Sequence, residues 1–589
     1  MSRLLALVKK QVEWGDGDFV SLSHGGCSSS SQAQTRRYRL IFDGKLFNRK
    51  SLLEKIPDAV RSADAIGDAE IVLALFEERG TGVFADLEGY WSLIIADNEK
   101  KQLIAARDHF GNRLLFYCYT AGYVGISSQS QLLHGVDESA REINKNAVVE
   151  YLLWGDIVRH NQQFFTNIHS LPPSHYLLYS FDNHDLKVNP YYELPYKRCK
   201  AGYNAYEEPL YIDNVRRWVL DSVRDNVENQ TRLALGVSGG LDSSSILCSA
   251  LKVHPDCRYT AFTFVNEHDN LEDFWAEKII KHTAVDWVKV PCRAADILED
   301  VPQVNSIQDV PIFNTSTLAQ YKIVQAAKER GFDAIVDGQG GDELFGGYTA
   351  YFPPFWNALL SQWFVKDWLI ELSNLKNADI TCKDALMLVL KNFAKKHFFT
   401  KEKLAQRTRP QELRFLNREW TDDYFRSAFP PEMQKEVLND YLYDSYAHLL
   451  SNISRWGISA AGSFGMDCLM PFANSKKMAE YVFSLPSTFK IHKGWGKYLL
   501  RSAMVGIVPD EIRWRRQKLG FYVPERYWLQ EIGNGMKQRI FDLNDTENFI
   551  DKTTLLNQWD SLYNSQNFHF QRFIFRYYSY LTWVNNLKG

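Results

Sequence analysis

Two groups of small and acidic residues in this chain have the types and spacing that bind a polyphosphate. The first follows the apolar segment 233–237 and reads Ser-Gly-Gly-Leu-Asp-Ser-Ser over 238–244, before a helical pattern at 245–251. Its glycines let the backbone approach a ligand closely, and the free N–H groups at the start of a helix attract anions. Asp242 beside a phosphate is favourable when its carboxylate holds Mg²⁺, because the two anions otherwise repel each other.

This segment differs from the phosphate loop of kinases and GTPases, which needs a Lys next to Ser or Thr after its glycines. A simpler interpretation is an ordinary strand–turn–helix with a serine cap. The length of the match, and its place between an apolar strand and a helix, favour the phosphate-binding interpretation.

A second glycine-rich loop follows another short apolar segment, 333–337. Five glycines lie among the ten residues 338–347, together with Asp342 and Glu343. Such a loop presses its backbone against a ligand, and the two acids offer the hard oxygens that Mg²⁺ prefers. One loop alone would also suit a turn or a linker. Because ligands gather at the carboxyl ends of parallel strands, the two loops are expected to meet over one nucleotide.

Together with three later motifs, these loops resemble the asparagine synthetase superfamily. The later motifs are Ser-Arg-Trp-Gly at 454–457 leading to Met-Pro-Phe at 470–472, Lys-Tyr-Leu-Leu-Arg at 497–501, and Arg-Gln-Lys-Leu-Gly-Phe at 516–521. The resemblance covers nearly the whole chain and is specific for the superfamily, not for the substrate. It implies an ATP pyrophosphatase domain of the adenine-nucleotide alpha hydrolase type, with ATP and Mg²⁺ as cofactors.

The resemblance also implies roles for individual residues. By resemblance, pyrophosphate is bound by Ser238, Gly239, Gly240 and Ser243, and magnesium by Asp242 and Asp342. Adenine is bound by the backbone at Val237 and Phe264. The other residues of the nucleotide site are Ser244, Gly338, Gln339 and Gly340. Lys497 matches the family lysine that stabilises charge developing during adenylation and aminolysis, which makes Asp242, Asp342 and Lys497 the catalytic set. A solvated surface lysine is the alternative interpretation of Lys497.

Gln339 departs from the family. Asparagine synthetases carry Glu between the two glycines and β-lactam synthetases carry Tyr, whereas this chain has Gln339. An amide cannot accept a proton as a base does. The duty of the base must therefore fall on another group or on the substrate itself.

Composition excludes several function classes. The 589 residues carry a formal charge of −3 with no basic stripe, which argues against a nucleic-acid surface. No apolar run reaches about 18 residues and the N-terminus is too short for a signal peptide, so we expect a cytoplasmic protein without membrane segments. The eight cysteines are scattered, as in reduced proteins, and no zinc-binding spacing occurs.

The elements suggest two domains. Short β-like runs and two helical stretches (70–78 and 145–153) indicate a layered sandwich within 1–195, and the resemblance makes it an αββα sandwich of the N-terminal-nucleophile type. A linker is expected near 194–209. Strand patterns at 232–237, 259–264, 286–290 and 333–338 alternate with helices and predict a parallel sheet within 205–589. The fold class is therefore α/β.

A helical insertion interrupts this alternation at about 349–430. Trp356, Trp363, Phe364 and Trp368 are spaced for an apolar helix face. A helical subdomain core is the favoured interpretation, and a ligand surface is the alternative.

In asparagine synthetases the N-terminal domain is a glutaminase whose exposed cysteine attacks glutamine. This chain has Ser2 after Met1, which could still act as a nucleophile. The family's Asn-Gly-Glu, which lines the glutamine and oxyanion pocket, is Asp43-Gly44-Lys45 here, so the electrostatics of that pocket are reversed. Structural motifs of the domain persist at 67–70, 86–90 and 107–111. We expect a scaffold that has lost its reaction, with a residual amidohydrolase as the alternative.

Without glutamine as ammonia source, the nitrogen must arrive with the substrate. The reaction would then be adenylation of a carboxylate, release of pyrophosphate, attack by an amine and release of AMP. Superfamily members without a working glutaminase include β-lactam synthetases, carbapenam synthetases and lasso-peptide cyclases. The length of the chain, the aromatic helical insertion and the loop at 338–342 favour a lasso-peptide cyclase, which joins an Asp or Glu side chain of a precursor core peptide to the peptide's N-terminal amine.

Such a cyclase implies as partners the precursor peptide, a leader-peptide-processing cysteine protease and a leader-recognition element. Three alternatives remain. The first is a β-lactam-type or carbapenam-type synthetase acting on a small molecule, the second an asparagine synthetase that uses free ammonia, and the third a nucleotide-binding scaffold without activity.

Overall fold

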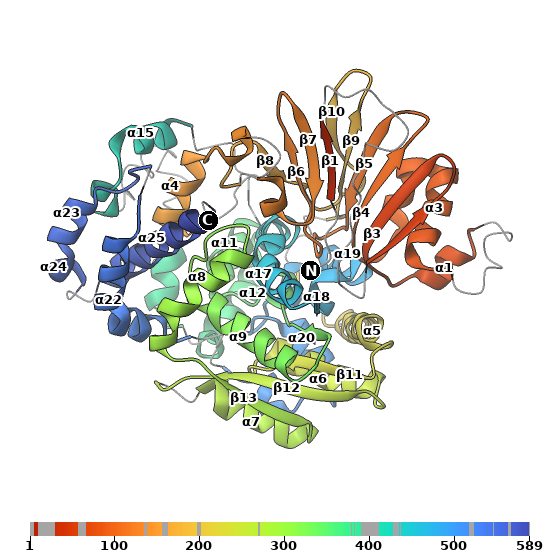
Figure 1. Cartoon of the computed structure of the whole chain (residues 1–589). Coiled ribbons are helices and arrows are strands. Elements are labelled where there is room, and N and C mark those ends of the chain that lie inside the picture. The colour runs from red at the N-terminus through yellow and green to blue at the C-terminus, as the bar shows by residue number, and fades with distance from the viewer. Residues whose placement is uncertain are drawn as a thin grey trace.

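Three β-sheets organise the part of the chain that the structure describes (Figure 1). The computed structural model describes residues 5–9, 30–56, 66–134, 138–155, 163–196, 202–268, 271–378, 380–381, 383–389, 411–427, 435, 437–516, 523–545, 547–563 and 567–587. In these ranges no helix is both long and apolar enough to cross a membrane.

Two antiparallel sheets form a sandwich in the N-terminal part. The four-stranded sheet has the order β1 (Leu5–Lys9), β7 (Tyr123–Ser127), β6 (Phe116–Tyr119) and β8 (Ile168–Ser170). The six-stranded sheet has the order β10 (Leu186–Pro190), β9 (His175–Ser180), β5 (Gln102–Arg107), β4 (Gly89–Asp97), β3 (Tyr38–Leu46) and β2 (Ser30–Gln34). Along β4, Ile94 packs between the sheets while Leu93 and Ile95 pack with helix α3 (Asp68–Arg79), as period-2 alternation requires. The predicted layering of sheets and helix is therefore present.

The third sheet is parallel throughout. Its strand order is β13 (Asp286–Pro291), β12 (Arg258–Val265), β11 (Arg232–Gly236), β14 (Ala334–Val336) and β15 (Asp467–Leu469). The chain leaves β11 toward β12 and β13 and later returns to the other side with β14 and β15. The order thus reverses between β11 and β14, and a reversal of this kind opens a crevice at the carboxyl ends of the two strands. The predicted α/β class and parallel sheet are confirmed.

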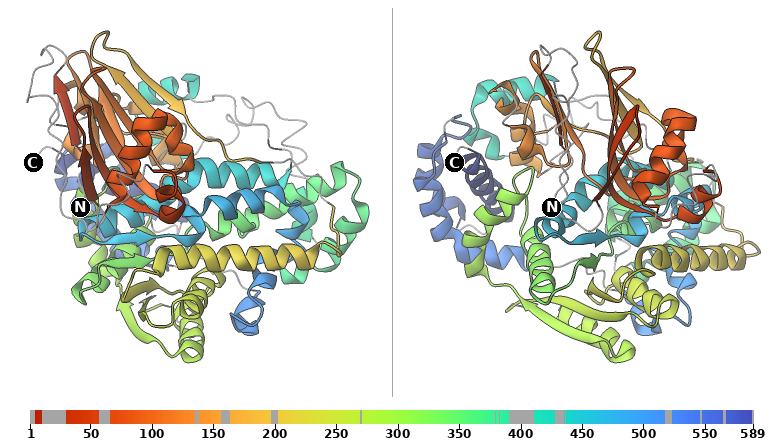
Figure 2. Two further views of the ribbon diagram at one scale, coloured as in Figure 1. Left: turned by 90° about the vertical axis from the view of Figure 1, so that its right-hand side faces the viewer. Right: turned by 45° about the vertical axis from the view of Figure 1, so that its right-hand side comes forward.

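Helices on both faces cover this sheet. The ones that matter for the site are α5 (Glu208–Val227), α6 (Leu241–Val253), α7 (Leu271–Thr283), α9 (Ser316–Glu329), α10 (Gly341–Phe345), α17 (Leu450–Ser463), α18 (Pro471–Asn474) and α20 (Tyr498–Ala503). Figures 1 and 2 show the antiparallel sandwich on one side of the molecule and β11–β13 on the opposite side, with α17 and α18 between them.

The described part of residues 349–430 is largely helical, with α11 (Phe352–Ser361), α12 (Val365–Ser373) and α15 (Arg418–Ser427). Trp356 is fully buried, but Trp363 is 87% exposed, so the predicted single apolar face is wrong at this position. Trp363 has φ 64° and lies between α11 and α12. The helix ends there, and the periodicity assumed for one continuous helix no longer places the side chain inward.

One hydrophobic core runs through both parts of the chain. It extends from Phe116 in β6 to the C-terminal helix α25 (Phe568–Asn586). Phe164, from the N-terminal part, lies edge-on against Trp583 of α25 with ring centroids 5.3 Å apart. The N-terminal part therefore packs directly against the C-terminal part, while the interior between the two sheets remains a separate cluster.

Candidate active site

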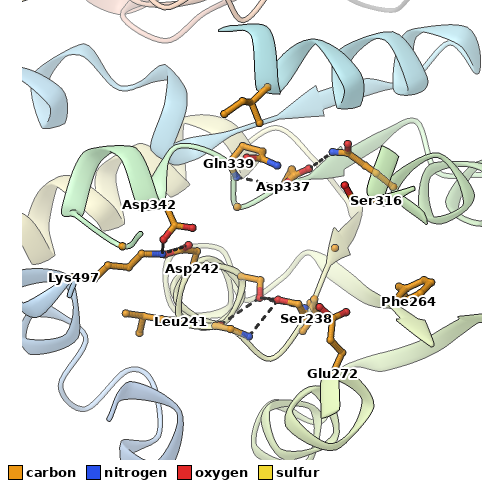
Figure 3. A pocket seen from close by; sticks show the side chains of 18 of the residues that line it. Ser238, Leu241, Asp242, Phe264, Glu272, Ser316, Asp337, Gln339, Asp342 and Lys497 are labelled. Carbon is orange, nitrogen blue, oxygen red and sulfur yellow. Dashed lines mark hydrogen bonds and ion pairs between the residues drawn. The ribbon is translucent and has the colours of Figure 1, made fainter. Parts of the chain in front are cut away.

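A pocket of about 420 Å³ opens at the carboxyl ends of β11 and β14, where the strand order reverses. This volume is typical of a small-molecule site. Figure 3 shows Ser238 below the pocket, Asp337 and Gln339 above it, the group Asp242, Asp342 and Lys497 on one side, and Phe264 and Glu272 on the other. The two predicted loops therefore meet over one cavity.

The first loop is shaped for close approach of an anion. Gly239 has φ +66°, and a Cβ there would lie 2.3 Å from the carbonyl carbon of Trp275. The Ser238 hydroxyl accepts from the Gly240 N–H (3.3 Å) and lies 3.4 Å from the Ser243 hydroxyl. Helix α6 begins at Leu241, so its first N–H groups face the pocket beside two hydroxyls. This arrangement suits a phosphate chain.

The second loop carries Asp342 against the start of α6. A Cβ at Gly341 would lie 2.6 Å from Asp242 Oδ1, and one at Gly347 would lie 1.7 Å from Asp342 Oδ1. Gly340 has φ +97° and packs against the backbone of Phe472 and Ala473. The glycines therefore bring the Asp242 and Asp342 carboxylates together.

Lys497 joins these two carboxylates. Its Nζ lies 2.7 Å from Asp342 Oδ1 and donates to Asp242 Oδ2. The residue is 7% exposed and precedes α20 with φ 54°. Burial acts to lower the pKa of Lys497, but the two carboxylates outweigh it and raise the pKa above its ordinary value. A charged ammonium is thus held inside the pocket, not in bulk solvent.

The acid pair fits a magnesium ion that also has phosphate ligands. Among the described residues, no group of three or more His, Cys, Asp or Glu could hold a metal ion. Mg²⁺ is usually bound by one or two carboxylates together with substrate phosphates and water. Asp242 and Asp342 would hold it, next to the phosphate-binding turn at Ser238.

Glu343 stands behind the acid pair and not in the pocket lining. It is 1% exposed, and its Oε1 accepts from the Tyr348 hydroxyl. Burial, followed by the nearby Asp342 charge, raises the pKa of Glu343 to about 7. The carboxylate of Glu343, which was expected to offer an oxygen to Mg²⁺, therefore binds Tyr348 and supports the loop.

Three other predicted residues lie as follows. Val237 lines the pocket; its N–H donates to Phe262 O (2.9 Å) and its carbonyl accepts from the Thr263 hydroxyl (2.7 Å). Phe264 lines the pocket wall and packs edge-on against Trp528. Ser244 is fully buried on α6 and does not line the pocket.

Gln339 and Gly338 line the upper wall. A Cβ at Gly338 would lie 3.3 Å from the Asp242 Cβ, so this wall packs directly on the start of α6. The Gln339 N–H donates to Asp337 Oδ1 (3.2 Å).

Sequence reasoning missed three charged residues of this pocket, Glu272, Asp337 and Arg515. Arg515 is 8% exposed, donates from Nη1 to the Gly239 carbonyl (3.2 Å) and stacks over Trp275. Burial lowers the pKa of Arg515 to about 10, so it stays charged at neutral pH next to the phosphate turn. Asp337 was noted only as the end of a strand. The sequence signal for Arg515 was the basic stretch before the 516–521 motif. The signal for Asp337 was an acid at the carboxyl end of β14.

Lys45 in the N-terminal part contacts the C-terminal part directly, and Asp43 is linked to it through Arg113. Asp43 is 3% exposed and lies 3.6 Å from Arg113 Nε, and Arg113 also pairs with Asp467 of β15. Lys45 Nζ donates to the Asp225 carbonyl at the end of α5 (2.9 Å). The cavity lined by Asp43 and Arg113 measures about 50 Å³, which is space for a few water molecules.

Some predicted positions lie outside the described residues: Ser2, three of the cysteines, and most of the 516–521 motif. The five described cysteines are buried.

Comparison with known proteins gives consistent results for the two parts. A family described as asparagine synthase matches residues 214–584, and a glutamine amidotransferase domain matches residues 23–192. Asparagine synthetase (glutamine-hydrolyzing) 1 of Bacillus subtilis is 23% identical over 543 residues, covering 91% of this chain and 83% of that protein. The protein named amidase chry2 of Gibberella zeae is 22% identical over 582 residues, covering 89% and 83%.

Among solved structures, the NH3-dependent NAD synthetase of Campylobacter jejuni is 13% identical with a TM-score of 0.18, covering 38% of this chain and 99% of that one. This likeness is too low to support an argument.

Proposed function

This chain belongs to the asparagine synthase family, whose members are ATP-dependent, AMP-forming carbon–nitrogen ligases, and we propose that its nitrogen donor is an amine of the substrate. The pocket supports the first half of such a reaction. The start of α6, the hydroxyls of Ser238 and Ser243, and Arg515 offer donors and positive charge for the two outer phosphates of ATP. Mg²⁺ held at Asp242 and Asp342 would neutralise the negative charge of the phosphates.

In the adenylation step a substrate carboxylate oxygen attacks the α-phosphorus, the bond to the β-phosphate oxygen breaks, and pyrophosphate leaves with the electron pair. The residues act by binding and orientation, because phosphoryl chemistry needs little else from the protein. Lys497, buried beside Asp242 and Asp342, places a fixed positive charge where negative charge accumulates.

The observation that carries the choice of nitrogen donor is the environment of Asp43 and Lys45. A glutaminase pocket of this family needs an oxyanion donor and a partner for the glutamine ammonium at these two positions. Here Asp43 faces Arg113 and Lys45 binds the backbone of α5. Lys45 contacts the C-terminal part directly, and Asp43 faces Arg113, which pairs with Asp467 there, so ammonia from glutamine is not the supply we propose.

For the substrate we propose a precursor peptide, in which the acyl-adenylate forms on an Asp or Glu side chain and the N-terminal amine closes a macrolactam, as in lasso-peptide cyclases. Residues of the helical region, Thr349, Phe352, Asn377 and Ala378, line the pocket. The helical region thus forms one wall of the pocket, on which a folded peptide would bind, and this supports the proposal. A leader-processing cysteine protease and a leader-recognition element are the partners that this proposal implies.

A second candidate is synthesis of asparagine from aspartate and free ammonia. The similarity to the Bacillus subtilis asparagine synthetase over 91% of this chain favours it. Both candidates share the adenylation step and differ in the acyl group and the amine. β-Lactam-type cyclisation of a small molecule would be a third use of the same pocket.

Substrate-dependent ATP–pyrophosphate exchange separates these candidates. The probes are a synthetic peptide pool with free N-termini and one internal Asp or Glu, aspartate with ammonium chloride, and glutamine alone. We expect exchange and a peptide product lighter by one water with the peptide pool, and no ammonia from glutamine. Exchange with aspartate alone would refute the peptide proposal, and hydrolysis of glutamine would refute the proposed nitrogen donor.

A further inference from the structure

Asp337 presents a carboxylate to the pocket from the carboxyl end of β14. Its N–H donates to Leu469 O on β15 (2.8 Å), which fixes the backbone at the strand end. Its Oδ2 accepts from the Gln320 side chain of α9 (2.7 Å), and its Oδ1 accepts from the Gln339 N–H (3.2 Å). Figure 3 shows the carboxylate beside Gln339 on the wall that faces Ser238. The carboxylate is therefore held in one orientation by neutral donors.

The charge of Asp337 has no cation among the described groups that act on it. Burial raises the pKa of Asp337, and the opposing influences are hydrogen bonds from Gln320 and from the N–H groups of Gln339 and Gly338. Asp337 is half-buried and lines the pocket, and a carboxylate withdrawn from water in this way is costly unless a positive charge accompanies it. Asp242 and Asp342, by contrast, share Lys497. A positively charged ligand would complete the environment of Asp337.

The neighbouring pocket wall suits an amine on an organic substituent. Phe313 and Trp456, from the segment before α9 and from α17, line the pocket and have ring centroids 5.7 Å apart. Ile453 and Gln320 line it as well. Aromatic rings and a carboxylate together are the groups that attract an ammonium in a site with little water. We call Asp337, Gln320, Phe313, Ile453 and Trp456 the amine chamber.

The amine chamber adjoins the phosphate-binding turn. Asp337 is followed by Gly338, which packs on Asp242 at the start of α6. An amine at Asp337 would therefore lie on the pocket wall that packs against the start of α6, beside the proposed magnesium and phosphate site. This is the position that a nucleophile needs in order to reach an acyl group on the α-phosphate.

We propose that Asp337 binds the ammonium of the acyl acceptor and takes its proton, which makes it the catalytic base that Gln339 cannot be. This inference rests on the proposed amide-forming function and assigns its amine subsite to a primary amine. The ammonium passes one proton to the Asp337 carboxylate, and the amine nitrogen then attacks the acyl carbon of the adenylate. As the tetrahedral adduct collapses, the bond from carbon to the phosphate oxygen breaks and AMP leaves with that electron pair and the second proton.

The test compares two nucleophiles on one acyl-adenylate. The variant Asp337→Asn keeps the shape of the side chain and removes its charge. Hydroxylamine is uncharged at neutral pH and needs no base, whereas the amine of the peptide arrives protonated. Loss of a general base costs about 10²–10⁴-fold in rate. We therefore expect Asp337→Asn to lose amide formation by about that factor while pyrophosphate exchange and hydroxamate formation stay within about threefold of the unmodified protein.

Two further variants act as controls. Asp337→Glu should recover part of the amide formation, because it restores the charge at a slightly displaced position. Asp333→Asn removes an exposed carboxylate that pairs with Lys328 at the start of the same segment, and it should leave every rate unchanged. A fold defect would appear as a lower Tm in Asp337→Asn, and hydroxamate formation would fall with it.

Several results would overturn the proposal. Equal losses with hydroxylamine and with the amine would mean that Asp337 positions the acyl group. A raised KM for ATP in the exchange reaction would mean that Asp337 binds the nucleotide sugar instead. An unchanged rate of amide formation in Asp337→Asn would show that Asp337 is not the base. If only aspartate supports exchange, the peptide proposal fails, and the same comparison with ammonium chloride as acceptor still decides the role of Asp337.

Discussion

Replacing Lys497 by Met tests whether this lysine is the counter-ion of the acid pair. The change removes the ammonium that lies 2.7 Å from Asp342 and donates to Asp242, and it keeps the apolar stem. Loss of one partner of a buried ion pair costs about 3–5 kcal/mol. Because both carboxylates keep 19% of their side-chain surface exposed, water screens part of the repulsion, and we expect about 2–4 kcal/mol.

This loss should appear as a lower Tm in magnesium-free buffer. Taking the conversion for domains of about 150–250 residues, about 2–4 °C per kcal/mol, as an upper guide, the shift is at most about 4–16 °C. Millimolar Mg²⁺ should recover part of the loss in Lys497→Met. It should have little effect on the unmodified protein without ATP, because Lys497 already neutralises the carboxylates and the phosphate ligands of Mg²⁺ are absent. Pyrophosphate exchange should be abolished in the variant whether or not Mg²⁺ is present.

Differential scanning fluorimetry with and without Mg²⁺ makes the measurement. Lys281→Met is the matched control, because Lys281 pairs with Glu277 on the surface with 72% of its side chain exposed; its Tm should move by less than about 1–2 °C. Equal stability of Lys497→Met and the unmodified protein without Mg²⁺, or an equal Mg²⁺ response in both, would refute the assigned role.

Gly347→Ala places a methyl group 1.7 Å from Asp342 Oδ1, and pyrophosphate exchange should fall by more than about 100-fold; exchange within a few-fold of normal would show that the loop relocates freely. Glu343→Gln removes a carboxyl whose folded pKa, about 7, exceeds its ordinary value of 4.5. The folded state of the unmodified protein binds this proton more tightly, so its stability should fall by about 3 kcal/mol as pH rises from 4.5 to 7, and the variant should lack this component in Tm measurements between pH 5 and 8. The double variant Asp43→Asn, Lys45→Glu restores the family's residue types. It should release no ammonia from glutamine, and its Tm should be lower because the contacts to Arg113 and α5 are lost. Glutamine hydrolysis by this variant would contradict the proposed loss of that reaction.

The sequence predicted the parts of the site that depend on local chemistry. The turn at Ser238 and the loop around Asp342 each combine glycines that only a close approach explains with an acid at the start of the following helix. Both follow apolar segments that are strands in the structure, and the parallel sheet accordingly brings the two loops together. The link from Asp242 to Lys497 spans 255 residues and was accessible only through the resemblance to a family.

Other features depend on contacts that no local pattern encodes. Lys45 binds a carbonyl 180 residues away, and Arg113 pairs with Asp467 at a separation of 354 residues. The role of Asp337 rests on which groups surround its carboxylate, and this is known only once α9 and β15 are in place. Trp363 was misplaced because α11 ends at Ser361 and α12 begins at Val365, with Trp363 at positive φ in the segment between them.

Strand β15 bears on how this protein can change over evolution. At one end Asp467 pairs with Arg113 of the sandwich, and at the other end Leu469 holds the N–H of Asp337. A gene that lost the N-terminal part would therefore encode a protein with a loosened strand directly behind the pocket, and with Trp583 stripped of the Phe164 ring that covers it. Selection for the synthetase pocket is thereby also selection for the sandwich, and the first third of the chain can be retained indefinitely without any chemistry of its own.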